Sequence, residues 1–190
     1  MKKVIFFDFF GVISSEIAVV FFNNRYEPEF AQKIKDEIFV RADAGEIDED
    51  TTYELIAKAT GENKESIRNE WYNLVHINEK LVNYILELKK THKVYLLSNA
   101  ISSYLRSILE KYDLYKCFDK TFISAEIHKI KPHADYFLHV TNELNLDPKD
   151  CIMIDDNPTN IAGAESVGIN GIVFKDVDDL KTNIERIENE

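Results

Sequence analysis

The chain has 190 residues, of which 45% are hydrophobic and 30% are charged, and its formal net charge at pH 7 is -11. This composition predicts an ordinary globular protein with enough apolar residues for a sizeable core. The negative charge argues against nucleic acid or an anionic membrane surface as a partner, because both attract concentrated positive charge. The sequence indicates no protein partner.

The two cysteines, Cys117 and Cys151, have neither metal-type spacing nor the density of a disulfide scaffold, which favours a reducing compartment. The first predicted strand starts at Lys2 and leaves no room for a signal peptide, and no apolar stretch is long enough to span a membrane. We therefore expect a cytoplasmic protein.

A short apolar run opens the chain and ends in a turn. Residues 2–12 (KKVIFFDFFGV) predict a strand that is buried on both faces and that ends near Asp8. In an open parallel sheet, ligands bind beyond the carboxyl ends of the strands, and Gly11 allows the backbone to turn tightly beside the carboxylate. Taken alone, Asp8 fits a core strand that ends in an ordinary turn equally well.

Residues 14–80 show the 3.6-residue period of helices and contain no convincing strand. Ser14 or Ser15 should open a first helix, Pro28 suits the start of a second, and Gly61 should end a third. The predicted helices cover about residues 17–22, 28–42, 50–59 and a segment that starts at Asn63 or Lys64. The block therefore predicts a helical bundle inserted between the first strand and the rest of the chain.

Aromatic residues within this block could line a substrate pocket or form its core. They lie at helical spacing, which is more typical of buried packing. We expect these residues to pack in the core of the block, and a substrate pocket lined by them is the alternative. They are Phe21, Phe22, Trp71 and Tyr72.

From residue 78 onward, helical and strand patterns alternate. Strands are predicted over residues 94–97, 121–123, 151–154 and 171–174, and helices over 78–90, 101–111, 134–145, 158–167 and 177–187, with a loop at 124–133. This alternation predicts an α/β fold with a doubly wound parallel sheet. We expect residues 1–13 and 81–190 to form this Rossmann-like core and residues 14–80 to form a small all-α cap domain.

Polar residues lie at the predicted strand ends or in a neighbouring loop: Asp8, Ser98 with Asn99, Lys131, and Asp155 with Asp156. Because the carboxyl ends of parallel strands meet at one edge, these groups should share one crevice. Three carboxylates beside one ammonium need a compensating charge, and oxygen ligands with an open position fit Mg²⁺. Lys131 would then meet a substrate phosphate from another side, and Ser98 would donate a hydrogen bond to it.

These segments resemble the motifs of the haloacid dehalogenase superfamily of hydrolases, and the resemblance covers nearly the whole chain. Each motif alone is weak, but four in the right order, each at a predicted strand end or loop, are specific. The helical block at residues 14–80 resembles the cap that many members insert after the first motif. The four segments are Asp8-Phe9-Phe10-Gly11-Val12, Leu96-Leu97-Ser98-Asn99-Ala100, Lys131-Pro132 and Ile154-Asp155-Asp156-Asn157.

The resemblance implies a role for each residue of these motifs. Asp8 would be the nucleophile, and Lys131 and Ser98 would complete the catalytic set. Ser98, Asn99 and Lys131 would bind the substrate. The implied ligands of Mg²⁺ are Asp8, Asp156 and the backbone carbonyl of Phe10, with Asp155 helping directly or through water.

Position 10 departs from the pattern of the family phosphatases, which usually carry a second aspartate there as the general acid and base. Members that remove halide carry an aromatic residue at this position, so Phe10 raises the alternative of a dehalogenase. The pair Asp155 and Asp156 opposes that alternative, because metal-free dehalogenation has no use for two further carboxylates. A substitute acid could come from Glu16, His128 or His133, although each could also be an ordinary exposed loop residue.

We therefore predict a Mg²⁺-dependent phosphatase of small phosphorylated metabolites that works through an aspartyl-phosphate on Asp8. The alternatives are a dehalogenase of small 2-halo acids and a catalytically silent binding protein, both favoured by Phe10. The cap is where specificity should reside, since it contributes contacts to the part of the substrate that does not react.

Overall fold

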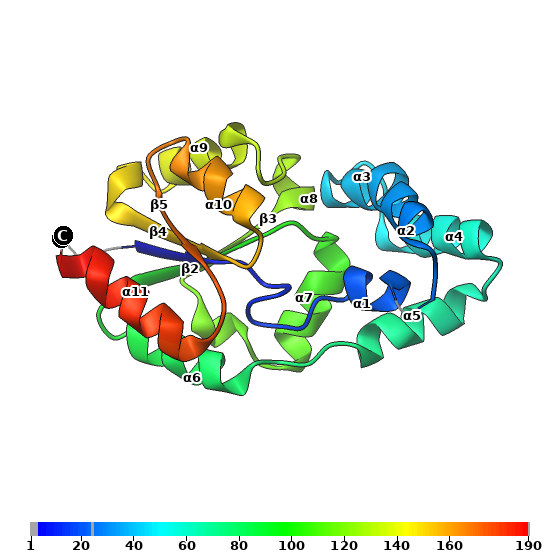
Figure 1. Ribbon diagram of the computed structural model, residues 1–190, viewed down its shortest axis with the longest axis horizontal. Helices are drawn as coiled ribbons and strands as arrows, with labels where there is room; N and C mark the ends of the chain where they lie inside the picture. Colours follow the sequence, from blue (N-terminus) through cyan, green and yellow to red (C-terminus); the bar gives the residue numbers. More distant parts are fainter. Residues whose placement is uncertain (1–3, 24, 190) are drawn as a thin grey trace.

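The sheet of the protein has five parallel strands in the order β3-β2-β1-β4-β5 (Figure 1). The computed structural model describes residues 4–23 and 25–189, so the predicted start of the first strand at Lys2 lies outside the described residues. All five strands were expected within about two residues of where they lie. Their bounds are β1 (Val4–Phe7), β2 (Lys93–Ser98), β3 (Lys120–Ile123), β4 (Cys151–Asp155) and β5 (Asn170–Val173).

The register of β1 brings the strand ends together. Phe7 lies opposite Leu96 of β2 and Ile154 of β4, and the Asp8 N–H continues the ladder by donating to the Ile154 carbonyl at 2.9 Å. The chain first builds the sheet from β1 towards β3 and later adds β4 and β5 on the other side of β1. In such sheets the crevice at this switch point is where ligands bind.

Helices cover both faces of the sheet, which confirms the predicted doubly wound α/β fold. The side chains of β1 alternate between the faces: Ile5 and Phe7 belong to one apolar cluster, and Val4 and Phe6 belong to another. The first cluster includes residues of α6 (Glu79–Leu88), α7 (Ser102–Lys111) and α11 (Val177–Asn189), and the second includes residues of α9 (Ala134–Glu143) and α10 (Pro158–Glu165).

The block between β1 and α6 is helical, as predicted, and lies beyond the carboxyl ends of the strands (Figure 1). The expected helix at 28–42 contains a π-helical segment, and Gly61 ends its helix with a φ of 77°. One expectation is wrong: the first helix begins at Ala18, and Ser14 forms isolated β-bridges to Phe10 and Ile77 instead of opening it. The elements are α1 (Ala18–Asn23), α2 (Pro28–Ile34), η1 (Lys35–Phe39), α3 (Val40–Asp43), α4 (Glu49–Thr60) and α5 (Lys64–Asn73).

The aromatic residues of this block are mainly core, as expected. Phe21, Phe22 and Trp71 are at most 4% exposed and belong to the same cluster as Ile5 and Phe7 of the sheet. Tyr72 is half-buried and packs against that cluster. Because the block and the sheet share one core, their division into two domains stays a prediction. The expected end of the cap domain at residue 80 falls in the first turn of α6.

The segment expected as a loop at 124–133 begins with a short helix, α8 (Ser124–Ile127), which corrects the prediction. Four residues are too few to show a helical period in the sequence. Two other short turns are 3₁₀-helical, η2 (Tyr115–Cys117) and η3 (Pro148–Asp150). Both cysteines are buried and free.

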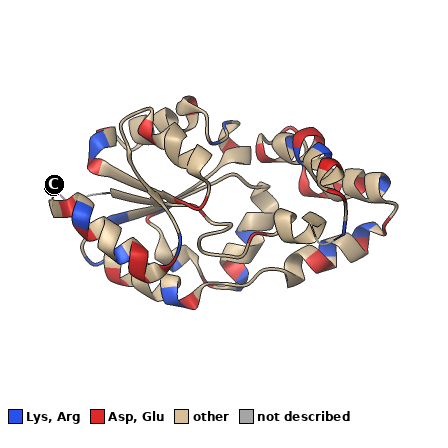
Figure 2. Cartoon of the chain, viewed as in Figure 1, with Lys and Arg blue, Asp and Glu red and all other residues tan. Residues whose placement is uncertain are grey.

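The surface carries many charges of both signs. In the view of Figure 2, acidic and basic residues are intermixed along the outer helices. Arg106 and Glu126, for example, form an ion pair at 2.6 Å that joins α7 to α8. Among the described residues, no helix is both long and apolar enough to cross a membrane.

Candidate active site

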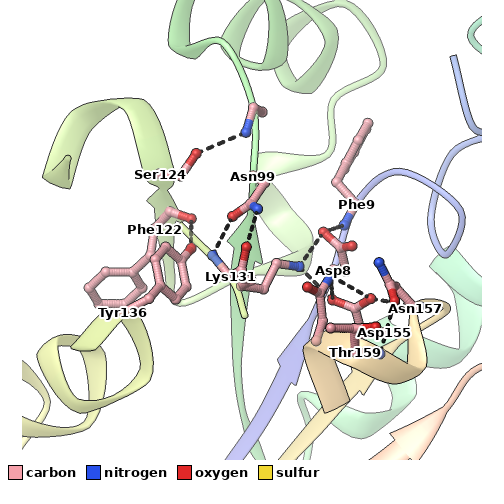
Figure 3. A network of polar contacts seen from close by, with 12 residues as sticks. Asp8, Phe9, Asn99, Phe122, Ser124, Lys131, Tyr136, Asp155, Asn157 and Thr159 are labelled. Carbon is pink, nitrogen blue, oxygen red and sulfur yellow. Dashed lines mark hydrogen bonds and ion pairs between the residues drawn. The ribbon is translucent and has the colours of Figure 1, made fainter. Parts of the chain in front are cut away.

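Asp8 lies directly after β1 at the centre of a polar network (Figure 3). Its side chain is mostly buried, and the residue is 7% exposed. One carboxylate oxygen, Oδ1, accepts a hydrogen bond from the Phe9 N–H at 2.7 Å and lies 2.9 Å from Nζ of Lys131. The carboxylate is therefore oriented by its own loop and by one buried cation.

Lys131 is buried, and its ammonium group lies between two carboxylates. Nζ is 2.9 Å from Asp8 Oδ1 and 2.6 Å from Asp155 Oδ2 (Figure 3). The backbone of Lys131 is fixed by Asn99, because the Lys131 N–H donates to Asn99 Oδ1 at 2.8 Å and Asn99 Nδ2 donates to the Lys131 carbonyl at 2.9 Å. Asn99 therefore positions Lys131, and its predicted contact with substrate stays a prediction.

Asp155 ends β4 and is completely buried. Besides the ion pair with Lys131, its carboxylate accepts hydrogen bonds from the Asn157 N–H at 2.9 Å and from Asn160 Nδ2 at 3.0 and 3.1 Å. Asn160 was not among the site residues predicted from the sequence. The available signal was its position in the first turn of the helix that follows the strand, where a side chain can reach back to the strand end.

Asp156 is half-buried and lies against the turn after Asp8. A Cβ atom at Gly11 would be 2.4 Å from the Asp156 carboxylate, so a larger residue would require the Asp156 side chain to move, and the φ of 79° also favours glycine. One oxygen from each of Asp8, Asp155 and Asp156 lies within 4.8 Å of the others. The structure thus brings the three predicted carboxylates and Lys131 into one place.

Burial and mutual charge shift the pKa values of these groups. Burial raises the pKa of Asp8 well above its ordinary value, with Lys131 opposing and Asp155 adding to the rise. Burial and the neighbouring Asp155 raise the pKa of Asp156. Burial alone would lower the pKa of Lys131, but the charges of Asp8 and Asp155 outweigh it and raise that pKa. With all three carboxyl groups ionised, the cluster would carry more negative charge than one ammonium can balance.

The donor atoms at this site fit Mg²⁺. The three carboxylates supply oxygen ligands, which this hard cation prefers. The fourth ligand that the resemblance implies is the Phe10 carbonyl oxygen: none of residues 4–23 and 25–189 donates a hydrogen bond to it, whereas the Phe9 carbonyl accepts hydrogen bonds from its own turn. The Phe10 oxygen is available to a cation.

Ser98 ends β2 and is completely buried. Its hydroxyl oxygen has no hydrogen-bond partner within the described part of the chain. A buried hydroxyl without a partner is unfavourable unless a ligand completes it. Its predicted role as a donor to substrate stays a prediction that this observation supports.

The side chain of Phe10 packs against aromatic rings. Its ring is edge-on to Phe9, with centroids 5.0 Å apart, and stacks on Tyr104 at 6.1 Å. It offers no proton to a leaving group. Of the suggested substitutes, His128 and His133 are exposed, and the His128 ring is bonded to a backbone carbonyl.

Glu16 is half-buried, and its environment differs from that of the two histidines. Burial, followed by the charges of Asp156 and Asp155, raises the pKa of its carboxyl to about 7. Glu16 is therefore within electrostatic range of the strand-end cluster.

A family model for haloacid dehalogenase-like hydrolases matches residues 2–168, which is most of the chain. The chain belongs to this family. The family assignment confirms the predicted resemblance. It also agrees with the four strand-end segments, each of which lies where its motif was expected.

Two curated relatives are similar in sequence. The chain is 24% identical over 163 residues to drimenol cyclase drtB of Aspergillus calidoustus, which covers 82% of this chain and 31% of the relative. It is 36% identical over 77 residues to flavin mononucleotide hydrolase 1 of Arabidopsis thaliana, which covers 40% of this chain and 31% of the relative. The chain thus matches about a third of the length of each.

A solved structure with the same fold is a HAD family (haloacid dehalogenase) enzyme from Bacteroides thetaiotaomicron. The TM-score is 0.82 at 24% identity, over 96% of this chain and 98% of that one. A further crystal structure of that enzyme contains magnesium and inorganic phosphate. At this level of identity the likeness shows the fold.

Proposed function

We propose that this hydrolase is a Mg²⁺-dependent phosphatase of small phosphorylated metabolites that acts through an aspartyl-phosphate on Asp8. The observation that carries the proposal is the position of Lys131 Nζ, between Asp8 at 2.9 Å and Asp155 at 2.6 Å, in a cluster with Asp156. Such a cluster suits an anionic substrate only when further positive charge is present. A cytoplasmic location belongs to the same proposal.

Asp8 would attack the phosphorus atom, and the bond from phosphorus to the alcohol oxygen would break. Water would then attack the acyl phosphate and restore the carboxylate. Lys131 would reduce the repulsion between Asp8 and the phosphate, and Ser98 would donate a hydrogen bond to a phosphate oxygen. When bound by Asp8, Asp155, Asp156 and the Phe10 carbonyl, Mg²⁺ would add positive charge at the phosphate.

The comparisons support this proposal. One relative is a flavin mononucleotide hydrolase, whose substrate is a phosphate ester, and the structural relative from Bacteroides has been crystallised with magnesium and inorganic phosphate. The net charge of -11 favours small substrates over nucleic acid.

A second candidate is dehalogenation of a small 2-halo acid. Phe10 favours it, because halide leaves without a proton and needs no acid at that position. The same residue favours a silent member that binds a phosphorylated ligand. Asp156 and the unpartnered Phe10 carbonyl oxygen favour a metal-dependent reaction over both.

The experiment measures phosphate release from p-nitrophenyl phosphate with and without Mg²⁺, and chloride release from 2-chloropropionate. We expect Mg²⁺-dependent phosphate release that is lost in Asp8→Asn and kept in Asp50→Asn, a change at an exposed carboxylate paired with Lys64. Chloride release that is lost in Asp8→Asn would favour the second candidate. No turnover in either assay would favour the silent member.

A further inference from the structure

The phosphatase reaction needs a proton for its leaving group, and Phe10 cannot supply one. The described residues bring two carboxyl groups into electrostatic range of the site from outside the strand ends. One is Glu16, in the segment between β1 and α1. The other is Asp43, the last residue of α3, which the sequence analysis did not single out.

Asp43 is held in place by the core. Its backbone carbonyl accepts a hydrogen bond from Ser124 Oγ at 2.6 Å, and the same Oγ accepts one from the Ala100 N–H at 3.0 Å. Two residues on, a Cβ at Gly45 would lie 2.2 Å from the Ala125 carbonyl oxygen, so this contact needs glycine. The end of α3 is thus docked on the segments that follow β2 and β3, close to the motif that contains Ser98.

The carbonyl of the next residue, Ala44, makes a further contact with the core. His128 Nδ1 is 2.9 Å from the Ala44 carbonyl oxygen, with His128 in the left-handed conformation that ends α8. Figure 1 shows α3 and α8 side by side, at the junction of the helical block and the sheet. The backbone position of Asp43 relative to the strand ends is therefore set by three contacts between residues 43–45 and residues 124–128.

The Asp43 carboxyl is half-buried, and none of the residues that the structure describes donates a hydrogen bond to it. The charged groups acting on it are Lys131 from the loop before α9, Glu16 from the β1–α1 segment and Lys35 from η1. His128, which follows α8, is a titratable group bonded to the neighbouring Ala44 carbonyl. Burial raises the pKa of Asp43 to about 7, with Lys131 opposing the rise and Glu16 adding to it.

Asp43 suits proton transfer better than Glu16 does. The pKa of Glu16 is raised by burial and by Asp156 and Asp155, so a divalent cation bound to these carboxylates would favour its ionised form. Lys131, which pairs with Asp8, acts on both carboxyl groups, but Asp155 and Asp156 are not among the charges that shift the pKa of Asp43. A carboxyl that is near half-protonation at neutral pH can serve both as an acid and as a base.

We propose that Asp43, brought to the site by the docking of α3 on the core, is the general acid and base of this enzyme. The inference rests on the proposed phosphatase function. In the first step, Asp8 forms a bond to phosphorus, the bond from phosphorus to the alcohol oxygen breaks, and the Asp43 carboxyl protonates that oxygen. In the second step, the Asp43 carboxylate takes a proton from the water that attacks phosphorus, and the bond to Asp8 breaks to release phosphate.

The test compares two substrates in Asp43→Asn with Mg²⁺ present. Nitrophenolate leaves without a proton, whereas the alkoxide of glycerol phosphate needs one. For glycerol phosphate we expect turnover to fall by about 10² to 10⁴-fold, the usual contribution of a general acid. For p-nitrophenyl phosphate we expect a burst of one nitrophenolate per enzyme and then slow turnover. The slow step would be hydrolysis of the aspartyl-phosphate, because the variant lacks the general base that activates the attacking water. The matched control is Glu46→Gln, an exposed carboxylate of the same turn.

The outcomes separate the two proposals. If the unaltered protein releases no phosphate from either ester, the proposed function fails and this inference fails with it. If the unaltered protein is active, and Asp43→Asn keeps turnover within twofold or slows both substrates equally without a burst, this inference alone is overturned.

The unaltered protein provides a test that does not depend on folding of the variant. Turnover of glycerol phosphate should fall above about pH 7, where Asp43 loses its proton, while first-turnover release of nitrophenolate should not. Identical pH profiles for the two substrates would overturn the inference.

Discussion

Gly11 and Asp156 approach so closely that a Cβ at position 11 would lie 2.4 Å from the Asp156 carboxylate. The turn after Asp8 and the residue that follows β4 are therefore in close contact. This contact places a carboxylate of one motif against the backbone of another, so we expect the proposed metal site to depend on a glycine at position 11.

Gly11→Ala should displace Asp156 and weaken Mg²⁺ binding by tenfold or more, measured as the Mg²⁺ concentration that gives half-maximal phosphatase activity. The matched control is Gly61→Ala, because Gly61 has nearly the same φ, 77° against 79°, but nothing within 4 Å of its Cβ position. Both variants should lose about 1–2 kcal/mol of stability, because alanine is strained at this positive φ. Equal Mg²⁺ dependence in the two variants would show that the contact with Asp156 does not matter.

Lys131→Met should remove activity and lower the free energy of unfolding. The change leaves the buried Asp155 without its cation, and breaking a buried ion pair from one side costs about 3–5 kcal/mol. Lys129→Met is the control, since Lys129 pairs with the exposed Asp135. Thermal unfolding and phosphate release measure both effects. A Lys131→Met protein as stable as the control would contradict the role of the ion pair.

Asn99→Asp tests the positioning of Lys131. An aspartate keeps the acceptor for the Lys131 N–H but loses the donor to its carbonyl, so we expect a loss of about 1–3 kcal/mol and a lower kcat. If Asn99 binds only substrate, KM should rise while the melting temperature stays unchanged. The two measurements therefore distinguish positioning from substrate contact.

The sequence could predict the convergence of Asp8, Lys131 and the two aspartates after β4, because parallel strands end at one edge whatever their side chains do. It could not predict that Asn99 holds the backbone of Lys131, since side-chain direction depends on tertiary contacts. Asp43 was missed because its place follows from the docking of α3 on α8. That docking depends on a short helix without a readable period and on the close approach of Gly45.

Stability without metal should depend on pH through Asp43. Its ordinary pKa of 3.8 is raised to about 7 by burial, so the folded protein holds this proton more tightly than the unfolded chain does. The resulting stabilisation is fully present below about pH 4 and is lost as the pH rises through about 7. In EDTA, the melting temperature of the unaltered protein should therefore fall more between pH 5 and pH 8 than that of Asp43→Asn. Glu46→Gln should keep the slope of the unaltered protein, and parallel slopes in all three would contradict this assignment.

Ser98→Ala separates ligand binding from stability. The Ser98 hydroxyl is buried without a partner, so removing it should leave the melting temperature unchanged or slightly higher. If the hydroxyl donates to a phosphate oxygen, the inhibition constant of inorganic phosphate should rise by about 5- to 13-fold, which corresponds to the loss of one hydrogen bond of about 1–1.5 kcal/mol.

The matched control for Ser98→Ala is Ser14→Ala, because Ser14 Oγ is also buried without a partner but lies in the turn that bridges to Ile77. Both variants remove the same atom from a similar environment, so a difference in phosphate inhibition reports on location alone. Equal phosphate inhibition in the two would mean that Ser98 makes no contact with the phosphate. In that case the unpartnered Ser98 oxygen would only lower stability. Of Ser98 and Lys131, only the Lys131 side chain would then contact the phosphate.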